Sequence, residues 1–180
     1  MKRNNMIQIL NNLKLITPPK MVREAMALLG TIETPGSKSN SVITNWAKET
    51  NTKDDDWYNT DSIPWCGLFI AVVAQRAGKE LPRNVLSALA WAKFGVSQEV
   101  AMLGDVLVFT RKGGGHVGLY VGESKDSYFV LGGNQSDKVS ITRILKNRLH
   151  SIRRPIYNVL PESVQRYYYT NQGGISTNES

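Results

Sequence analysis

The stretch DSIPWCGLFIAVVAQRA, at residues 61–77, contains Cys66, the only cysteine of the chain. A turn-forming lead with Pro64 precedes the cysteine, and apolar side chains then recur at helical spacing. Gly78 follows, as a glycine often does just past the end of a helix. The pattern predicts a buried helix that begins at or near Cys66. Because the unpaired N–H groups and the dipole of a helix N-terminus stabilise a thiolate, we expect a reactive cysteine here.

Outward from this helix, the two halves of the chain differ in pattern. Apolar side chains at helical spacing predict further helices before and after it, at residues 20–29, 41–50 and 87–94. The C-terminal half changes to apolar, β-branched runs that predict strands at residues 105–110, 116–122, 127–131, 138–144 and 151–154. Short turns join these runs, so neighbouring strands are predicted to be antiparallel. Helices followed by an antiparallel sheet of about five strands indicate an α+β fold.

The length of 180 residues is typical of one domain with extensions. We predict an N-terminal arm at residues 1–20, the main domain at 21–160 and a polar tail at 161–180. The arm starts with basic residues, but polar residues interrupt its apolar part and no cleavage site follows, so we expect no secretion signal. No apolar run approaches the roughly 20 residues that a membrane-spanning helix needs. We expect a monomer.

The chain is basic, with a formal net charge of +7. This charge favours an anionic partner, and nucleic acid, an anionic membrane surface and a bacterial cell wall all qualify. Basic residues are spread along the chain without a recognisable nucleic-acid motif, so we expect no nucleic-acid partner. A single cysteine excludes an intrachain disulfide.

A cysteine nucleophile needs a base, and the base needs a partner that orients it. His116 begins an apolar strand directly after residues 113–115, three glycines that leave room for a substrate; the alternative is a strand-end histidine bonded to the backbone. Asn134 follows the next strand, and adjacent antiparallel strands can bring it beside His116 to fix the imidazole. Gln135 is the nearest competitor for this role, and a turn asparagine is the plainer interpretation of Asn134. His150 lies among basic residues, and we predict no catalytic role for it.

Two residues of the lead before the cysteine are candidates for substrate binding. Trp65 can shape the cleft beside Cys66 or cap the core. Asp61 can face the substrate or brace the turn, and the sequence does not separate these alternatives.

Five stretches, taken together and in order, resemble a known family. They are ETPGSKSNSVITNWA (33–47), IPWCGLFIAVVAQRAG (63–78), GDVLVFTRKGGGHVGLYVGE (104–123), VLGGNQSDKVSI (130–141) and SIRRP (151–155). They resemble the CHAP family of cysteine, histidine-dependent amidohydrolases and peptidases, within the wider group of papain-like cell-wall hydrolases. The resemblance is closer to a phage and bacterial subgroup of peptidoglycan hydrolases, and it covers roughly residues 24–155.

The resemblance implies a papain-like fold with Cys66 as the nucleophile at a helix N-terminus, His116 as the base and Asn134 as the third member. Many CHAP enzymes carry a glutamate two residues before this asparagine, where the present chain has Gly132. The implied activity is endolysin-like: cleavage of an amide bond in the peptide part of peptidoglycan, without a metal or another cofactor. Such a protein would be made in the host cytoplasm and act in the periplasm or at the cell wall.

Two other functions remain open from the sequence. One cysteine and two histidines suffice for a three-ligand zinc site of an amidase, although no local ligand spacing appears. Alternatively, a papain-like scaffold without activity could serve as a wall-binding or virion protein, with the tyrosine run at residues 167–169 as a contact surface.

Overall fold

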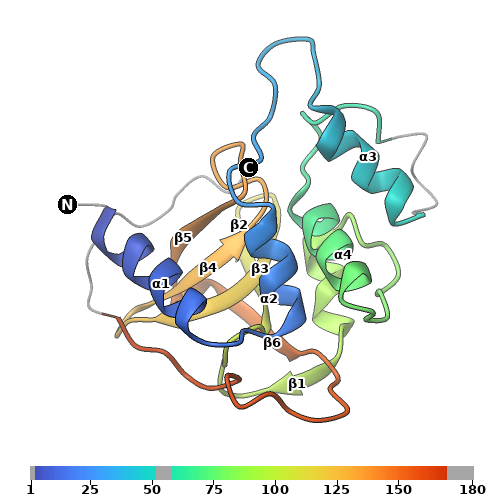
Figure 1. The fold of residues 1–180 in the computed structure, drawn as a ribbon. Helices are drawn as coiled ribbons and strands as arrows, with labels where there is room; N and C mark the ends of the chain where they lie inside the picture. The colour runs from blue at the N-terminus through green and yellow to red at the C-terminus, as the bar shows by residue number, and fades with distance from the viewer. Residues whose placement is uncertain (1–2, 52–57, 170–180) are drawn as a thin grey trace.

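The structure is a computed structural model that describes residues 3–51 and 58–169. Within these ranges the helices come first along the chain and the strands follow (Figure 1). The helices are α1 (Arg3–Leu15), α2 (Lys20–Ala27), α3 (Ser41–Glu49), α4 (Cys66–Arg76) and the short 3₁₀ helices η1 (Ala88–Lys93) and η2 (Lys146–Arg148). The strands are β1 (Val96–Gln98), β2 (Val106–Arg111), β3 (Gly114–Glu123), β4 (Ser127–Gly132), β5 (Ser140–Leu145) and β6 (Leu149–Arg154).

The described strands form one antiparallel six-stranded sheet in the order β1-β6-β2-β3-β4-β5. The α+β layout and the antiparallel sheet are therefore confirmed. The sequence missed β1, because three residues of VSQ carry no alternating pattern. The strand exists through its pairing with β6, in which Val96 lies opposite Arg154.

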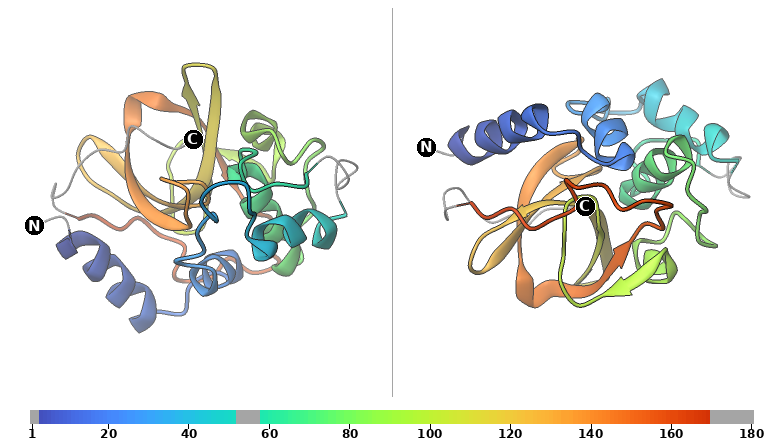
Figure 2. Two further views of the ribbon diagram at one scale, coloured as in Figure 1. Left: turned by 90° about the horizontal axis from the view of Figure 1, so that it is seen from above. Right: turned by 60° about the horizontal axis from the view of Figure 1, so that its bottom comes forward.

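The helices lie along one side of the curled sheet (Figure 2). Alternation along each strand supplies two apolar surfaces, and the surface toward the helices includes Val108, Val117, Leu119 and Leu131. The opposite surface packs a separate core around Phe109, Tyr120 and Val130. This division follows from the two-residue period of a strand.

Helix α4 is buried from Cys66 to Ala74, so it forms the centre of the helical layer. It begins at Cys66, and Gly78 after its end has a φ of 71°, as the sequence predicts for a helix-ending glycine. Gly67 allows close packing of the first turn, since a Cβ there would lie 2.3 Å from the carbonyl oxygen of Val85. The start of α4 is thus pressed against the segment that leads into η1.

The two ends of the described chain also pack on the body. Ile9 and Leu13 of α1 are buried in the main core, and the side-chain amide of Asn12 donates to the Tyr169 hydroxyl at 3.2 Å. The backbone of residues 167–169 runs along Glu123 of β3, with amide–carbonyl bonds of 2.8 Å on both sides. The folded body therefore continues to Tyr169, beyond the predicted boundary at residue 160. Residues 170–180 of the predicted tail lie outside the described part of the chain.

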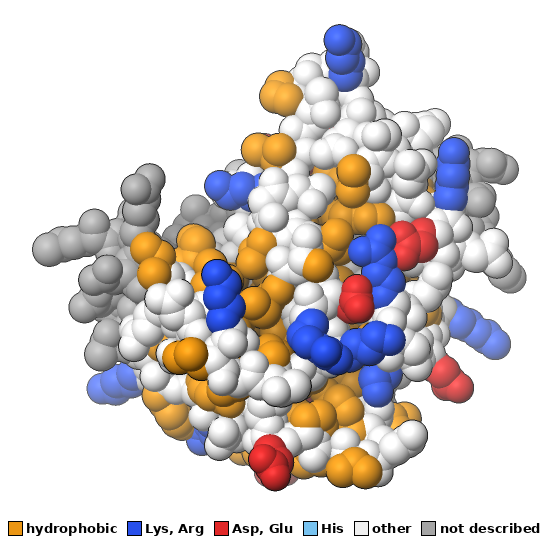
Figure 3. All heavy atoms as spheres, viewed as in Figure 1, with side chains coloured by type: hydrophobic (Ala, Val, Ile, Leu, Met, Phe, Trp, Pro, Cys, Tyr) orange, Lys and Arg blue, Asp and Glu red, His pale blue; other side chains and the backbone are white. Residues whose placement is uncertain are grey.

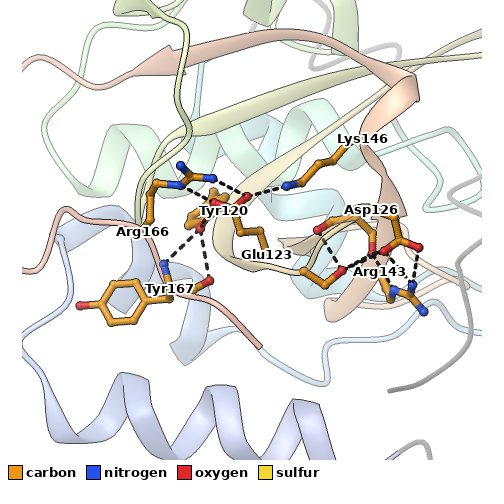
Figure 4. Close-up of polar contacts among 9 residues, drawn as sticks. Tyr120, Glu123, Asp126, Arg143, Lys146, Arg166 and Tyr167 are labelled. Atoms are coloured by element: carbon orange, nitrogen blue, oxygen red, sulfur yellow. Dashed lines mark hydrogen bonds and ion pairs between the residues drawn. The ribbon is translucent and has the colours of Figure 1, made fainter. Parts of the chain in front are cut away.

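A buried carboxylate fastens this C-terminal segment (Figure 4). Glu123 accepts hydrogen bonds from the Tyr120 hydroxyl at 3.0 Å, from Arg166 Nε at 2.8 Å and from Lys146 Nζ at 2.6 Å. Burial acts to raise the pKa of Glu123, but the bonds from Arg166, Lys146 and Tyr120 together lower it. The ionised carboxylate is thus part of the fold.

None of the helices in residues 3–51 and 58–169 has both the length and the apolar character that crossing a bilayer demands.

Candidate functional site

The thiol of Cys66 lies where the first turn of α4 meets β3. Cys66 is 4% exposed, and the backbone N–H groups of Val117, Gly67 and Cys66 itself lie close enough to its sulfur to act against the rise of its pKa. Val117 directly follows His116, so the fold brings the thiol within hydrogen-bond reach of the residue next to the predicted base.

The protonation of this thiol differs from the sequence expectation. Burial raises the pKa of the Cys66 thiol, and the amide donors and the charge of Arg111 lower it only in part. The net direction is upward, so the thiol is neutral at neutral pH in the structure. The dipole argument predicted a thiolate because it took no account of the apolar packing around the start of α4.

His116 is fully buried in β3 and meets a side chain from the turn after β4. Its Nε2 lies 3.1 Å from Oε1 of Gln135. The side-chain nitrogen of Gln135 donates to the carbonyl oxygens of Val130, Gly132 and Ser140. These acceptors determine the orientation of the amide, so its oxygen faces His116 and also accepts from the Thr142 hydroxyl at 2.8 Å.

The orientation of Gln135 determines the tautomer of His116. Because Oε1 of Gln135 can only accept, Nε2 of the neutral imidazole must carry the hydrogen. The lone pair is then on Nδ1, which is the nitrogen able to take a proton. A buried glutamine whose amide is bonded at both its nitrogen and its oxygen thus holds the ring in one tautomer.

Asn134 does not make this bond. It is 3% exposed, it adopts a φ of 54°, and its Oδ1 is buried without a hydrogen-bond partner among the described residues. The structure therefore favours Gln135, the alternative left open by the sequence, as the residue that orients His116. Adjacent turn residues after two glycines give no periodic signal, so the sequence could not separate position 134 from 135.

Gly132 explains how Gln135 reaches the imidazole. A Cβ at position 132 would lie 3.0 Å from Oε1 of Gln135 and 3.3 Å from Nε2 of His116. The absence of a side chain leaves the space that Gln135 occupies. At Gly133, a Cβ would lie 2.6 Å from both Phe69 and Trp65, so the turn packs directly on the start of α4.

Asp61 and Trp65 use their polar atoms within the protein. Oδ2 of Asp61, which is 2% exposed, accepts from the backbone N–H of Thr34 at 2.9 Å and of Asn40 at 2.7 Å. The indole of Trp65 is fully buried and donates to Glu33 Oε1 at 2.6 Å. These contacts favour bracing for Asp61 and core packing for Trp65, and their roles in substrate binding stay predictions.

His150 is exposed on β6. Among residues 3–51 and 58–169, the structure contains no group of three or more His, Cys, Asp or Glu side chains placed to hold a metal ion.

Comparison of the sequence with protein-family models gives no match, and comparison with curated proteins gives none either. The site combines a neutral thiol, backbone amide groups close to its sulfur, and a nearby imidazole that is held in one tautomer.

Proposed function

We propose that the protein is a cysteine amidohydrolase of the CHAP type, with a papain-like arrangement of its site, that cleaves an amide bond in the peptide part of bacterial peptidoglycan. The observation that carries the proposal is the bond between His116 Nε2 and Gln135 Oε1, beside a thiol at the start of α4. A cysteine, a histidine and an amide side chain in this relation are the parts of a Cys-His-amide hydrolase. The resemblance of the five stretches adds the substrate class.

In the proposed mechanism, Cys66 attacks the scissile carbonyl while Nδ1 of His116 accepts the thiol proton. Backbone N–H groups at the start of α4 stabilise the oxyanion, and each such donor is worth about 10²–10³ in rate. The imidazolium then protonates the leaving amine, a role worth roughly 10²–10⁴, and water hydrolyses the thioester. The raised pKa of the Cys66 thiol fits proton transfer during the attack better than a thiolate in the resting enzyme.

The proposed partner is the anionic cell wall, toward which a net charge of +7 attracts the protein. On the face seen in Figure 3, basic side chains are spread over several elements with acidic ones among them. A spread of this kind suits a broad polyanion rather than one groove. We further propose an endolysin-like role, with synthesis in a host cytoplasm and action in the periplasm or at the wall.

The test is the loss of turbidity of bacterial cells stripped of their outer membrane. We expect the parent and His150→Ala to clear the cells and Cys66→Ala and His116→Ala to leave them intact. Clearing by Cys66→Ala at the parental rate would show that the proposal is wrong. Mass spectrometry of the digested peptidoglycan then identifies the bond that is cut.

The burial of Cys66 favours a second candidate, a wall-binding or virion protein without activity. A protein of this kind would sediment with purified peptidoglycan but release no fragments, and Cys66→Ala would bind equally well. A zinc amidase would lose activity with a chelator and keep it after thiol alkylation, whereas the proposed enzyme would show the reverse.

A further inference from the structure

Arg111 is the last residue of β2 and lies at the hairpin that leads into β3. It is paired with Gly114, and its Nε donates to the carbonyl oxygen of Gly115 at 3.3 Å. Gly115 directly precedes His116. The guanidinium is therefore bonded to the residue that precedes the proposed base, at the end of a paired strand.

The charge of Arg111 has no acidic partner within residues 3–51 and 58–169. Other arginines of the described chain do: Arg76 pairs with Glu49, Arg154 with Asp105 and Arg166 with Glu123. Arg111 is half-buried, and its charge reaches the Cys66 thiol, whose pKa it lowers. A partly desolvated guanidinium with no carboxylate beside it is a favourable place for an anion.

Acidic groups lie near Tyr58, whose hydroxyl is bonded to the lead before α4. Burial first, and then the negative charges of Asp61 and Glu33, raise the pKa of Tyr58, so these two acidic groups lie near its hydroxyl. That hydroxyl is held by a bond of 3.0 Å to the carbonyl oxygen of Ile63, before α4. The acidic groups thus disfavour an anion near Tyr58, whereas the charge of Arg111, which acts on the Cys66 thiol, favours one at the hairpin.

We propose that Arg111 forms a carboxylate-binding subsite beside Cys66 and His116, which holds a free carboxylate of the peptide substrate next to the scissile bond. The planar guanidinium fits a carboxylate through two parallel bonds. The assignment of the ligand to a peptide stem rests on the proposed function, because peptidoglycan stems carry such carboxylates. The subsite itself can be tested without any turnover.

The first test compares alkylation of Cys66 by iodoacetate, an anion, and by iodoacetamide, its neutral analogue. Since Cys66 is the only cysteine, mass spectrometry reports its modification directly. We expect Arg111→Gln to lower the ratio of the iodoacetate rate to the iodoacetamide rate by about fivefold. The reason is that a single positive charge a short distance away, in a site open to water, attracts an anionic reagent by about this factor. Lys112→Gln removes an exposed charge from the same hairpin and should leave the ratio unchanged.

An unchanged ratio in Arg111→Gln, or an equal fall in Lys112→Gln, contradicts the proposal. So does a parent in which neither reagent modifies Cys66, because a subsite must be open to its ligand. Arg111→Lys keeps the charge and should retain most of the ratio of alkylation rates. This variant replaces Arg111→Gln in the experiment if Arg111→Gln does not fold.

The second test uses a peptide stem with a free carboxylate and the same stem with that carboxylate amidated. Arg111→Gln should lower kcat/KM for the free stem by about ten- to a hundredfold and leave the amidated stem nearly unaffected. Equal losses for both stems contradict the subsite. If Cys66→Ala still clears cells, the proposed function fails, but the alkylation ratio still decides whether Arg111 binds anions beside the thiol.

Discussion

At the scale of single residues, the amide of Gln135 holds the imidazole of His116 in one tautomer. Its nitrogen is bonded to backbone carbonyls of β4 and β5, so its oxygen cannot turn away from the imidazole. Gly132 leaves the room for this arrangement. In the proposed enzyme, Gln135 would take the orienting role that the resemblance assigns to Asn134.

We predict that Gln135→Ala lowers kcat by about 10² or more, since much of the contribution of a positioned base is lost with its orientation. The matched control is Asn134→Gly, because glycine adopts the φ of 54° without strain and only the side chain is removed. Release of peptidoglycan fragments, measured as kcat and KM, compares the two variants. A loss in Asn134→Gly as large as that in Gln135→Ala would return the orienting role to Asn134.

At the scale of elements, the start of α4 is held by loops that come from elsewhere in the chain. The carboxylate of Asp61 holds residues 34 and 40, which enclose the second half of the loop between α2 and α3 that projects at the top of Figure 1. Asn40 at the end of that loop also caps α3, because its side chain accepts from the N–H of Val42 at 2.9 Å. The lead before Cys66 is therefore a brace between helices.

We predict that Asp61→Ala lowers the free energy of unfolding by about 2 kcal/mol or more, because the N–H groups of Thr34 and Asn40 lose their acceptor. Ser62→Ala, at the exposed neighbouring position, should change it by less than about 0.5 kcal/mol. Urea denaturation measures both variants. A raised KM with unchanged stability in Asp61→Ala would instead support contact with the substrate.

At the scale of the whole molecule, the two ends of the described chain close the fold. The segment at residues 167–169 pairs with Glu123 and touches α1 through the bond between Asn12 and Tyr169. The carboxylate of Glu123 also forms ion pairs with Lys146 and with Arg166, the residue directly before this segment (Figure 4). The tyrosine run is thus at least partly a packing feature, which weakens its interpretation as a free contact surface.

We predict that Glu123→Gln lowers the free energy of unfolding at neutral pH by about 1–3 kcal/mol. The pKa of Glu123 is lowered in the folded state, so the unfolded chain binds more protons as the pH falls. The stabilisation is complete above the ordinary carboxyl pKa and is lost as the pH falls through the folded pKa. Denaturation at a series of acidic pH values should therefore show a shallower acid loss in Glu123→Gln than in the parent.

The control for this prediction is Glu162→Gln, an exposed carboxyl near the same segment. It should keep the acid loss of the parent. Equal slopes for the parent and Glu123→Gln would show that Glu123 does not carry the acid sensitivity.

The sequence by itself determined the order of the elements and the start of α4. Apolar spacing and glycine punctuation are local signals, and they sufficed for the helix that begins at Cys66 and for the antiparallel pairing of β2 with β3, β3 with β4 and β4 with β5. They did not predict that β6 leaves its neighbour in sequence, β5, and pairs with β2 and β1 at the other side of the sheet. The same local signals predicted a strand that begins at His116, whereas β3 begins two residues earlier, at Gly114. They also identified Asn134 and Gln135 as candidates for the partner of His116.

Only the tertiary structure decided between these two partners, because the choice depends on which amide meets the backbone carbonyls of β4 and β5. It also decided the protonation of Cys66, since the pKa of a thiol depends on how many apolar side chains exclude water from it. Two further pairings join segments that are distant in the chain, so no local pattern predicts them. They are the pairing of β1 with β6 and that of residues 167–169 with β3. Local chemistry thus determines which residues can act, and packing determines which of them meet.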